Sequence, residues 1–152
     1  MAQVTFAVQH ELPHPAKAVF DALVDWPGHA DWVPMTRVQV LEGTGGVGTT
    51  FVATTGLGPL GLADRMRVTA LDADRMHVQV VKIGPILTGE VTLSVTEAGE
   101  AASRVDWVED IHVPLLPQFA ARPVAALASA GFRSSLRRLA RRLGKGAGAS
   151  IP

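Results

Sequence analysis

The stretch VAALASAGFRSSLRRLARRLG, residues 124–144, places apolar or small residues three and four positions apart, which is the period of one face of an α-helix. Arg133, Arg137 and Arg141 fall on the opposite side. Such arginines either complement the helix dipole near its C-terminal end or form a patch for an anionic surface. Gly144 is a typical C-terminal stop. We therefore expect one long helix up to Gly144, followed by a flexible tail over 145–152.

The sequence before this helix predicts strands joined by short turns. Apolar and polar residues alternate in six segments, which are separated by turn-forming sequences such as GTGG, GLGPLG and LDADR. The expected strands are 36–42, 49–56, 62–71, 76–83, 87–96 and 103–113. Consecutive strands with short connections favour an antiparallel meander with one buried face.

The N-terminal part adds a seventh strand and two short helices. VTFAVQHEL, residues 4–12, alternates with period two, and HPAKAVFDALVDW, residues 14–26, changes to helical spacing. GHADW, residues 28–32, has room for one further turn. The order predicts an α+β fold in which a seven-stranded curved antiparallel sheet wraps around the long C-terminal helix. Residues 1–144 then form a single domain, and a lone helix leaves a space against so wide a sheet.

Composition excludes several classes of function. The chain has 152 residues, with 14 basic and 14 acidic side chains, so no global field attracts nucleic acid or an anionic membrane. It has no cysteine, which excludes thiolate metal sites and disulfides. No signal peptide or membrane-spanning segment is evident, and the prevalence of Arg, Ala, Val and Gly is typical of a GC-rich bacterial genome. We expect a bacterial, cytoplasmic protein that is a monomer or homodimer.

Five segments, in this order, resemble the START-like or SRPBCC superfamily: HELPHPAKAVFDALVDWPGHADWVP, GTGGVGTTF, ADRMRVTALDADR, LTGEVTLSVTEAGEAASRVDWVED and FRSSLRRLARRL. The resemblance covers nearly the whole chain. It implies the helix-grip fold of the polyketide cyclase/dehydrase-like proteins and a hydrophobic or amphipathic ligand held between sheet and helix. The aromatic cyclases of this superfamily use a pocket arginine with tyrosine. This chain has no tyrosine, and the phase of its strand points Arg65 and Arg67 outward.

Residues two apart in a strand share a face, so phase predicts which side chains line the space. Glu109 shares its face with Val105 and Trp107. A carboxyl group on an apolar wall has a raised pKa and is a candidate acid or base, unless it lies at the mouth or pairs with Lys82. Lys82 and Asp64 share the inward phase, although charges at strand ends are commonly solvated. The expected ligand-binding residues are Trp32, Met35, Phe51, Met66, Val78, Val80, Lys82, Val91, Leu93, Trp107, Glu109, Ile111, Leu127, Phe132 and Leu136.

The segment DWPGHADWVP, residues 25–34, is expected to close one end of this space. Trp32 and Met35 are placed at the gate, and Trp26 is packed under the first short helix. His29 lies near Asp25 and Asp31, but no further ligands converge on them, so we expect no metal. GTGGVG, residues 43–48, fits a dinucleotide pattern, but a strand follows it instead of a helix, so we expect a hairpin turn and no cofactor.

Three functions fit these observations. The first is binding of a hydrophobic or aromatic small molecule, such as a polyketide, lipid or isoprenoid-like compound, between sheet and helix. The alternative is a cyclase or dehydratase in which Glu109, with Lys82, transfers protons. In the third, side chains fill the interior and the domain is structural or mediates protein interactions. The sequence leaves open which of the three applies and therefore whether the protein is an enzyme.

Overall fold

The computed structural model describes residues 2–56 and 61–149. One antiparallel sheet contains seven strands in the order β1-β7-β6-β5-β4-β3-β2. The strands are β1 Ala2–Leu12, β2 Thr36–Glu42, β3 Thr50–Thr55, β4 Leu62–Asp72, β5 His77–Ile83, β6 Thr88–Glu97 and β7 Ser103–Val113. The helices are α1 Ala16–Leu23, the 3-10 turns η1 Pro27–Asp31 and η3 Gln118–Ala120, and α2 Ala121–Ala149. The predicted strands are confirmed to within a few residues; part of the predicted turn at 56–61 lies outside the described residues.

Alternating burial along the strands gives the sheet one packed face and one wet face. In β1, Val4, Phe6 and Val8 are buried, whereas their neighbours in the chain are exposed. β7 repeats the pattern with Val105, Trp107 and Glu109. β1 pairs with the last strand, β7, along its whole length. The first and last strands of the chain are therefore neighbours in the sheet.

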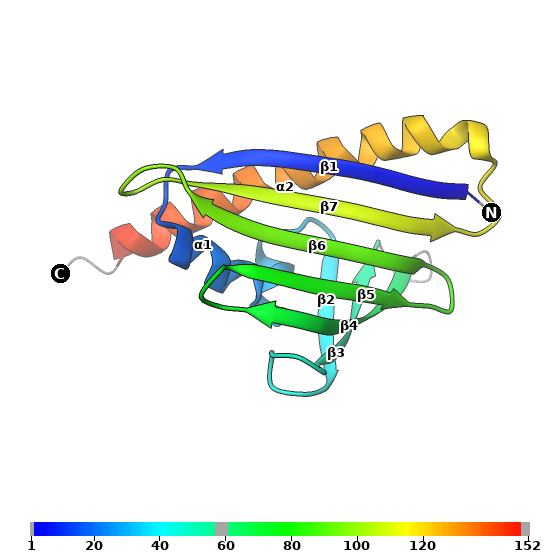
Figure 1. Ribbon diagram of the computed structural model, residues 1–152, viewed down its shortest axis with the longest axis horizontal. Helices are drawn as coiled ribbons and strands as arrows, with labels where there is room; N and C mark the ends of the chain where they lie inside the picture. Colours follow the sequence, from blue (N-terminus) through cyan, green and yellow to red (C-terminus); the bar gives the residue numbers. More distant parts are fainter. Residues whose placement is uncertain (1, 57–60, 150–152) are drawn as a thin grey trace.

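The sheet is strongly curved. β1, β7 and β6 run along the long axis of the molecule, whereas β2 and β3 stand almost upright in the same view (Figure 1). Register shifts occur between Val40 and Glu42 in β2 and between Val68 and Ala70 in β4. Such bulges increase local twist and let a sheet bend. The concave side that results is the side on which the other elements pack.

Helix α2 lies over one side of the sheet and packs mainly against β1 (Figure 1). Leu136 and Leu139 are fully buried in this contact. Phe132 stacks on Phe6, with ring centroids 5.7 Å apart. The far half of the sheet, from β2 to β5, therefore needs other elements to cover it.

The predicted end of the long helix is wrong. α2 continues through Gly144 to Ala149, so residues 145–149 of the expected tail are helical, while residues 150–152 lie outside the described part. Glycine inside a helix costs about 1 kcal/mol relative to alanine and does not by itself end the helix. A glycine signal without a following proline was therefore insufficient to place the end.

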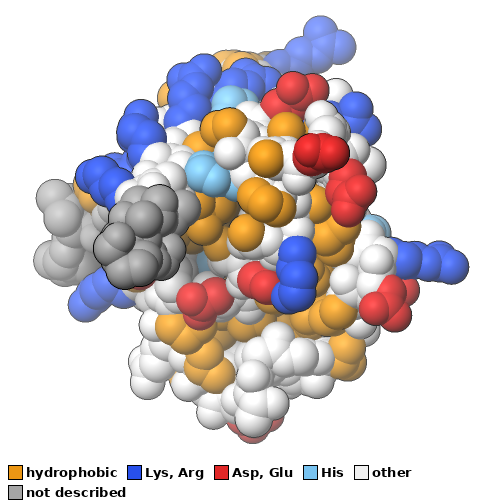
Figure 2. Space-filling model, turned by 90° about the vertical axis from the view of Figure 1, so that its left-hand side faces the viewer, with side chains coloured by type: hydrophobic (Ala, Val, Ile, Leu, Met, Phe, Trp, Pro, Cys, Tyr) orange, Lys and Arg blue, Asp and Glu red, His pale blue; other side chains and the backbone are white. Residues whose placement is uncertain are grey.

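The exposed side of α2 is basic in its C-terminal half. Arg133, Arg137 and Arg141 are exposed in the C-terminal half, and Arg142 pairs with Asp31 of η1 at 3.1 Å. Figure 2 views the molecule from the end at which α2 finishes and shows Lys and Arg side chains along the upper left edge. In the part of the chain that the structure describes, no helix is long and apolar enough to span a membrane.

Candidate functional site

A cavity of about 140 Å³ lies on the concave side of the sheet. Its walls come from β2 to β7, the segment around η1 and one residue of α2, and they are mostly apolar. The side chains that line it are Trp26, His29, Val33, Thr36, Val38, Phe51, Ala53, Thr55, Leu62, Asp64, Met66, Val80, Lys82, Val91, Leu93, Trp107, Glu109 and Phe132.

The cavity lies in a different place from the predicted one. We expected the long helix to form one whole wall, but among the described residues of α2 only Phe132 lines the space. Trp26, His29 and Val33 cover the sheet instead. The reason is that α2 follows β1 at one side of the sheet, which leaves the curved half to the η1 segment.

The structure brings nine of the fifteen predicted ligand-binding residues to the cavity wall. They are Phe51, Met66, Val80, Lys82, Val91, Leu93, Trp107, Glu109 and Phe132. All but Phe132 lie on strands. The period of two therefore placed them correctly, because each strand keeps the same phase across the part that faces the cavity.

The other six predicted residues do not line the cavity. Trp32, Val78 and Leu136 are buried in the surrounding core, and Ile111 packs partly buried against that core. Leu127 is 76% exposed and Met35 is 62% exposed, so neither forms a cavity wall. Leu127 lies on the outer side of α2, and Met35 follows Pro34 in a turn with a φ of 54° that directs its side chain outward.

The register of the strands explains how charged residues meet inside the sheet. Met66 of β4 lies opposite Lys82 of β5, and Lys82 lies opposite Gly89 of β6. In the next inward-facing row, Val80 lies opposite Val91, and Val91 lies opposite Glu109 of β7. Lys82 and Glu109 thus share the concave face, on strands that are separated by β6 and in rows two residues apart.

Lys82 and Asp64 form a buried ion pair. The Lys82 ammonium donates to Oδ2 of Asp64 and lies 3.9 Å from the Met66 sulfur. The two side chains are only 8% and 12% exposed. Oδ1 of Asp64 is buried and has no hydrogen-bond partner among the described residues. The expectation that both charges face inward is confirmed, and they neutralise each other there.

Glu109 is the second acidic group of the site, and it is 4% exposed. Trp107 Nε1–H donates to its Oε1 at 3.0 Å. Burial raises the pKa of the Glu109 carboxyl above its ordinary value; the Lys82 charge and the Trp107 hydrogen bond oppose this shift, and the Asp64 charge adds to it. The surroundings therefore shift the equilibrium towards the neutral acid, relative to a carboxyl group in water.

Aromatic side chains form the opposite wall. Trp26 stacks on Phe51 with centroids 4.8 Å apart, and its Nε1–H donates to the Gly45 carbonyl at 2.9 Å. Gly45 belongs to the turn between β2 and β3, the segment that resembled a dinucleotide motif. His29 packs between Trp26 and Trp32.

The tautomer of His29 follows from its partner. Its Nε2 lies 2.6 Å from the Leu23 carbonyl, which can only accept, so Nε2 carries the proton. Burial lowers the pKa of His29, against the opposing effects of that hydrogen bond and of Asp25. A neutral imidazole with Nδ1 as an acceptor is the result. No group of three or more His, Cys, Asp or Glu side chains suited to a metal occurs among residues 2–56 and 61–149.

Sequence reasoning missed nine lining residues. Five of them, Thr36, Val38, Ala53, Thr55 and Leu62, share the inward phase of their strands, so the period of two was sufficient to find them. Asp64 was considered for the same reason but was left out of the predicted set. Trp26, His29 and Val33 lie in the η1 segment, where no strand or long helix sets the direction of a side chain.

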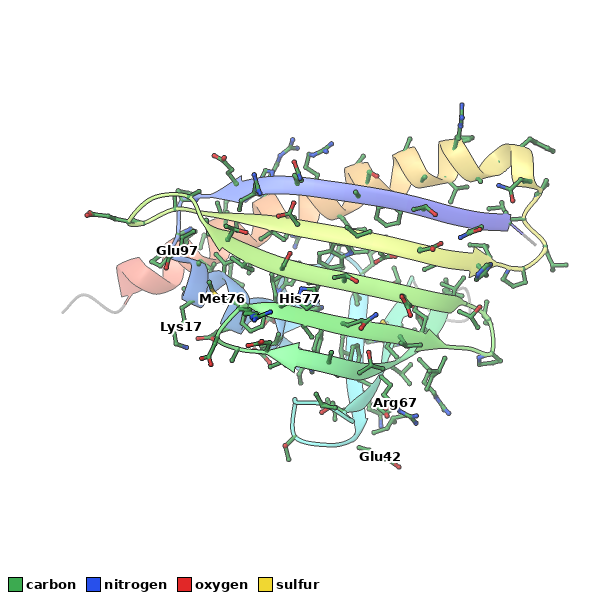
Figure 3. All side chains as sticks on the ribbon, in the orientation of Figure 1. Lys17, Glu42, Arg67, Met76, His77 and Glu97 are labelled. Carbon is green, nitrogen blue, oxygen red and sulfur yellow. The ribbon has the colours of Figure 1, made fainter. Side chains whose placement is uncertain are left out.

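Arg65 and Arg67 alternate with the lining residues of β4 and are exposed, as predicted. Figure 3 shows Arg67 at the lower edge of the sheet, where its side chain extends away from the strands. Its Nε–H donates to Thr50 Oγ1 at 3.4 Å. The cationic group inside the cavity is therefore Lys82 and not an arginine.

The curved sheet, the long C-terminal helix and the cavity between covering elements define the helix-grip class of START-like proteins. The chain belongs to the family described as polyketide cyclase/dehydrase and lipid transport, whose sequence profile matches residues 3–144. A search of curated proteins found no relative that matches this sequence.

Solved structures share the fold at low sequence identity. The Zhui aromatase/cyclase from Streptomyces sp. R1128 has a TM-score of 0.76 and 16% identity, over 92% of this chain and 93% of that one. A START superfamily protein from Mycobacterium smegmatis has a TM-score of 0.78 and 14% identity, over 93% and 97%. Ginseng major latex-like protein 151 from Panax ginseng has a TM-score of 0.73 and 13% identity, over 93% and 98%.

Proposed function

We propose that this protein binds a hydrophobic or aromatic small molecule in the cavity between the sheet, the η1 segment and Phe132. The observation that supports this most is an apolar space that contains few polar groups, which is the usual composition of a ligand site. The proposal includes no nucleic-acid partner and no resident cofactor. It places the chain in the bacterial cytoplasm as a monomer or homodimer.

Affinity would come mainly from apolar contact. An aromatic side chain buries about 150–250 Å² when it enters a core, and each Å² contributes about 25 cal/mol. A ring-sized ligand would then gain about 4–6 kcal/mol before the cost of immobilising it. Before that cost this gain corresponds to dissociation constants of about 0.04–1 mM, so binding in the millimolar range is expected for such a probe.

The test uses isopropylbenzene as an uncharged, apolar probe. Trp26 and Trp107 line the cavity, so binding should change the intrinsic fluorescence of the protein. Ala53 also lines the cavity, and Ala53→Phe should fill it and abolish the saturable change. Ala126→Phe adds the same side chain on the exposed side of α2 and should leave binding intact.

Far-UV circular dichroism of both variants controls for folding. If folded wild-type protein shows no saturable change with isopropylbenzene, binding in this cavity is wrong and the structural function is favoured. Equal binding by Ala53→Phe and the wild type would place the probe elsewhere on the molecule. Either result contradicts the proposal.

A second candidate function is enzymatic proton transfer, as in a cyclase or dehydratase. The observation that favours it is the buried Glu109 carboxyl beside Lys82 and Asp64, because an acid with a raised pKa is suited to general acid and base work. The test follows loss of deuterium from the methyl group of methyl-deuterated acetophenone in ordinary water by NMR. Exchange that depends on Glu109 should disappear in Glu109→Gln while binding remains. Unchanged exchange would exclude this mechanism.

A further inference from the structure

The size of the cavity limits the ligand. Sites for drug-sized ligands usually enclose about 300–1,000 Å³, whereas an apolar cavity of about 150 Å³ holds benzene. The cavity here is about 140 Å³. As it stands it fits about a single ring, and not a fused-ring polyketide or a long acyl chain.

The charges of the cavity wall select against an ionised ligand. Lys82 is already paired with Asp64, so an anion would have to compete with Asp64 for the same ammonium group. A cation would need a free carboxylate, but the surroundings of Glu109 favour its neutral form. Burying an ion without a partner is costly. An uncharged ligand avoids both costs.

When it is protonated, the Glu109 carboxyl offers a hydrogen-bond donor to the cavity. Oε1 accepts from Trp107, so the proton resides on Oε2. The Glu109 side chain lines the cavity, so its second oxygen is available to a ligand there. A protonated carboxyl group at this point would find its acceptor in a ligand. A carbonyl oxygen satisfies this donor.

We propose that the cavity takes an uncharged, ring-sized carbonyl compound whose oxygen accepts a hydrogen bond from the Glu109 carboxyl group. This inference rests on the proposed binding function and names the class of ligand for it. The ring would lie among Trp26, Phe51 and Phe132, and the carbonyl would point towards β7.

The experiment compares two probes of nearly equal shape, acetophenone and isopropylbenzene, in three proteins. Glu109→Leu removes the donor, and Glu109→Gln keeps a donor and still accepts from Trp107. Glu109→Leu should weaken acetophenone binding about tenfold, the usual net contribution of one hydrogen bond. It should not weaken isopropylbenzene binding, which also reports that the variant is folded. Glu109→Gln should bind acetophenone within a few-fold of the wild type.

The affinity of each probe for a variant is compared with the affinity of the same probe for the wild type. The different hydrophobicities of the two probes therefore do not affect the comparison. If Glu109→Leu changes both affinities equally, the carbonyl assignment is overturned while the binding function stands. If neither probe binds the wild type, the binding function itself fails. Benzoate is the third probe; benzoate binding as tight as that of acetophenone would show an anion site and overturn the uncharged ligand.

The pH dependence gives a second measurement. Acetophenone affinity of the wild type should fall as pH rises through the folded pKa of Glu109, since the carboxylate cannot donate. The other ionisable groups that line the cavity are Lys82 on β5, Asp64 on β4 and His29 on η1. These three are unchanged in Glu109→Gln, so its affinity should not show this fall. Parallel profiles for the two proteins would overturn the assignment to Glu109.

Discussion

Glu109 should make the stability of the fold decrease as pH rises. Its pKa in the folded protein lies above the ordinary value of 4.5, chiefly because the side chain is buried. Between these two pKa values the folded state binds more protons than the unfolded state. The stabilising contribution is therefore complete below about pH 4.5 and is lost as pH rises through the folded pKa.

The magnitude follows from linkage of one proton. The free energy of unfolding should fall by about 1.4 kcal/mol for each pH unit between the unfolded and folded pKa values of Glu109. In a protein of this size about 1 kcal/mol corresponds to about 2–4 °C in Tm, so the slope is about 3–6 °C per pH unit. Glu109→Gln removes the titrating group but keeps an acceptor for Trp107.

The assay is urea or thermal unfolding of both proteins at intervals from pH 4 to pH 9. The difference in unfolding free energy between Glu109→Gln and the wild type should widen with the slope given above and become constant above the folded pKa. Contributions from all other titrating groups cancel in this difference. Glu90→Gln, on the exposed face of β6, should show no such widening. Parallel curves for Glu109→Gln and wild type would refute the buried, neutral carboxyl.

Three further predictions concern stability. Leu136→Ala should cost about 2–5 kcal/mol in urea unfolding because the side chain is fully buried, whereas Leu127→Ala should change stability by less than about 0.5 kcal/mol; equal effects would contradict the placement of α2. Lys82→Met should cost about 3–5 kcal/mol because it leaves Asp64 buried and unpaired, and Asp64→Leu in the same protein should recover most of that loss, which a double-mutant cycle measures. Gly89→Ala should cost about 2 kcal/mol or more, since a Cβ at its φ of 135° would lie 2.2 Å from a carbonyl oxygen of β7; wild-type stability would contradict this register.

The strands were predictable because burial on one face leaves a period of two in the sequence. β7 was placed at its observed bounds, and Glu109 was correctly assigned to the inner face with Trp107. The same argument placed Met66 and Lys82 on the cavity wall, although they are far apart in sequence from Glu109. The alternation of inward-facing and outward-facing residues is a local property of each strand. A single sequence is therefore sufficient to predict it.

The covering elements were not predictable to the same extent. The apolar stripe of α2 predicts that the helix has a buried face, but the residues that lie on that face depend on the path of β1. Leu127 is exposed because it lies about two and a half turns before Leu136 and therefore on the opposite side of α2. The orientation of Trp26 depends on a hydrogen bond to Gly45, a contact across 19 residues that no local pattern records.

The ionisable groups in the cavity are more readily explained by ligand recognition than by stability. Burying Asp64, Lys82 and Glu109 costs desolvation energy, and replacing a buried ion pair by apolar side chains often stabilises a protein. Val80, Val91 and Leu93 on the neighbouring wall already belong to the hydrophobic core. Apolar side chains in place of the ionisable ones would extend that core. Binding sites commonly retain such groups at the expense of stability. The apolar variant Asp64→Leu/Lys82→Met should therefore fold well and bind isopropylbenzene, and it should still bind acetophenone more tightly than benzoate, because an apolar wall offers an anion no partner.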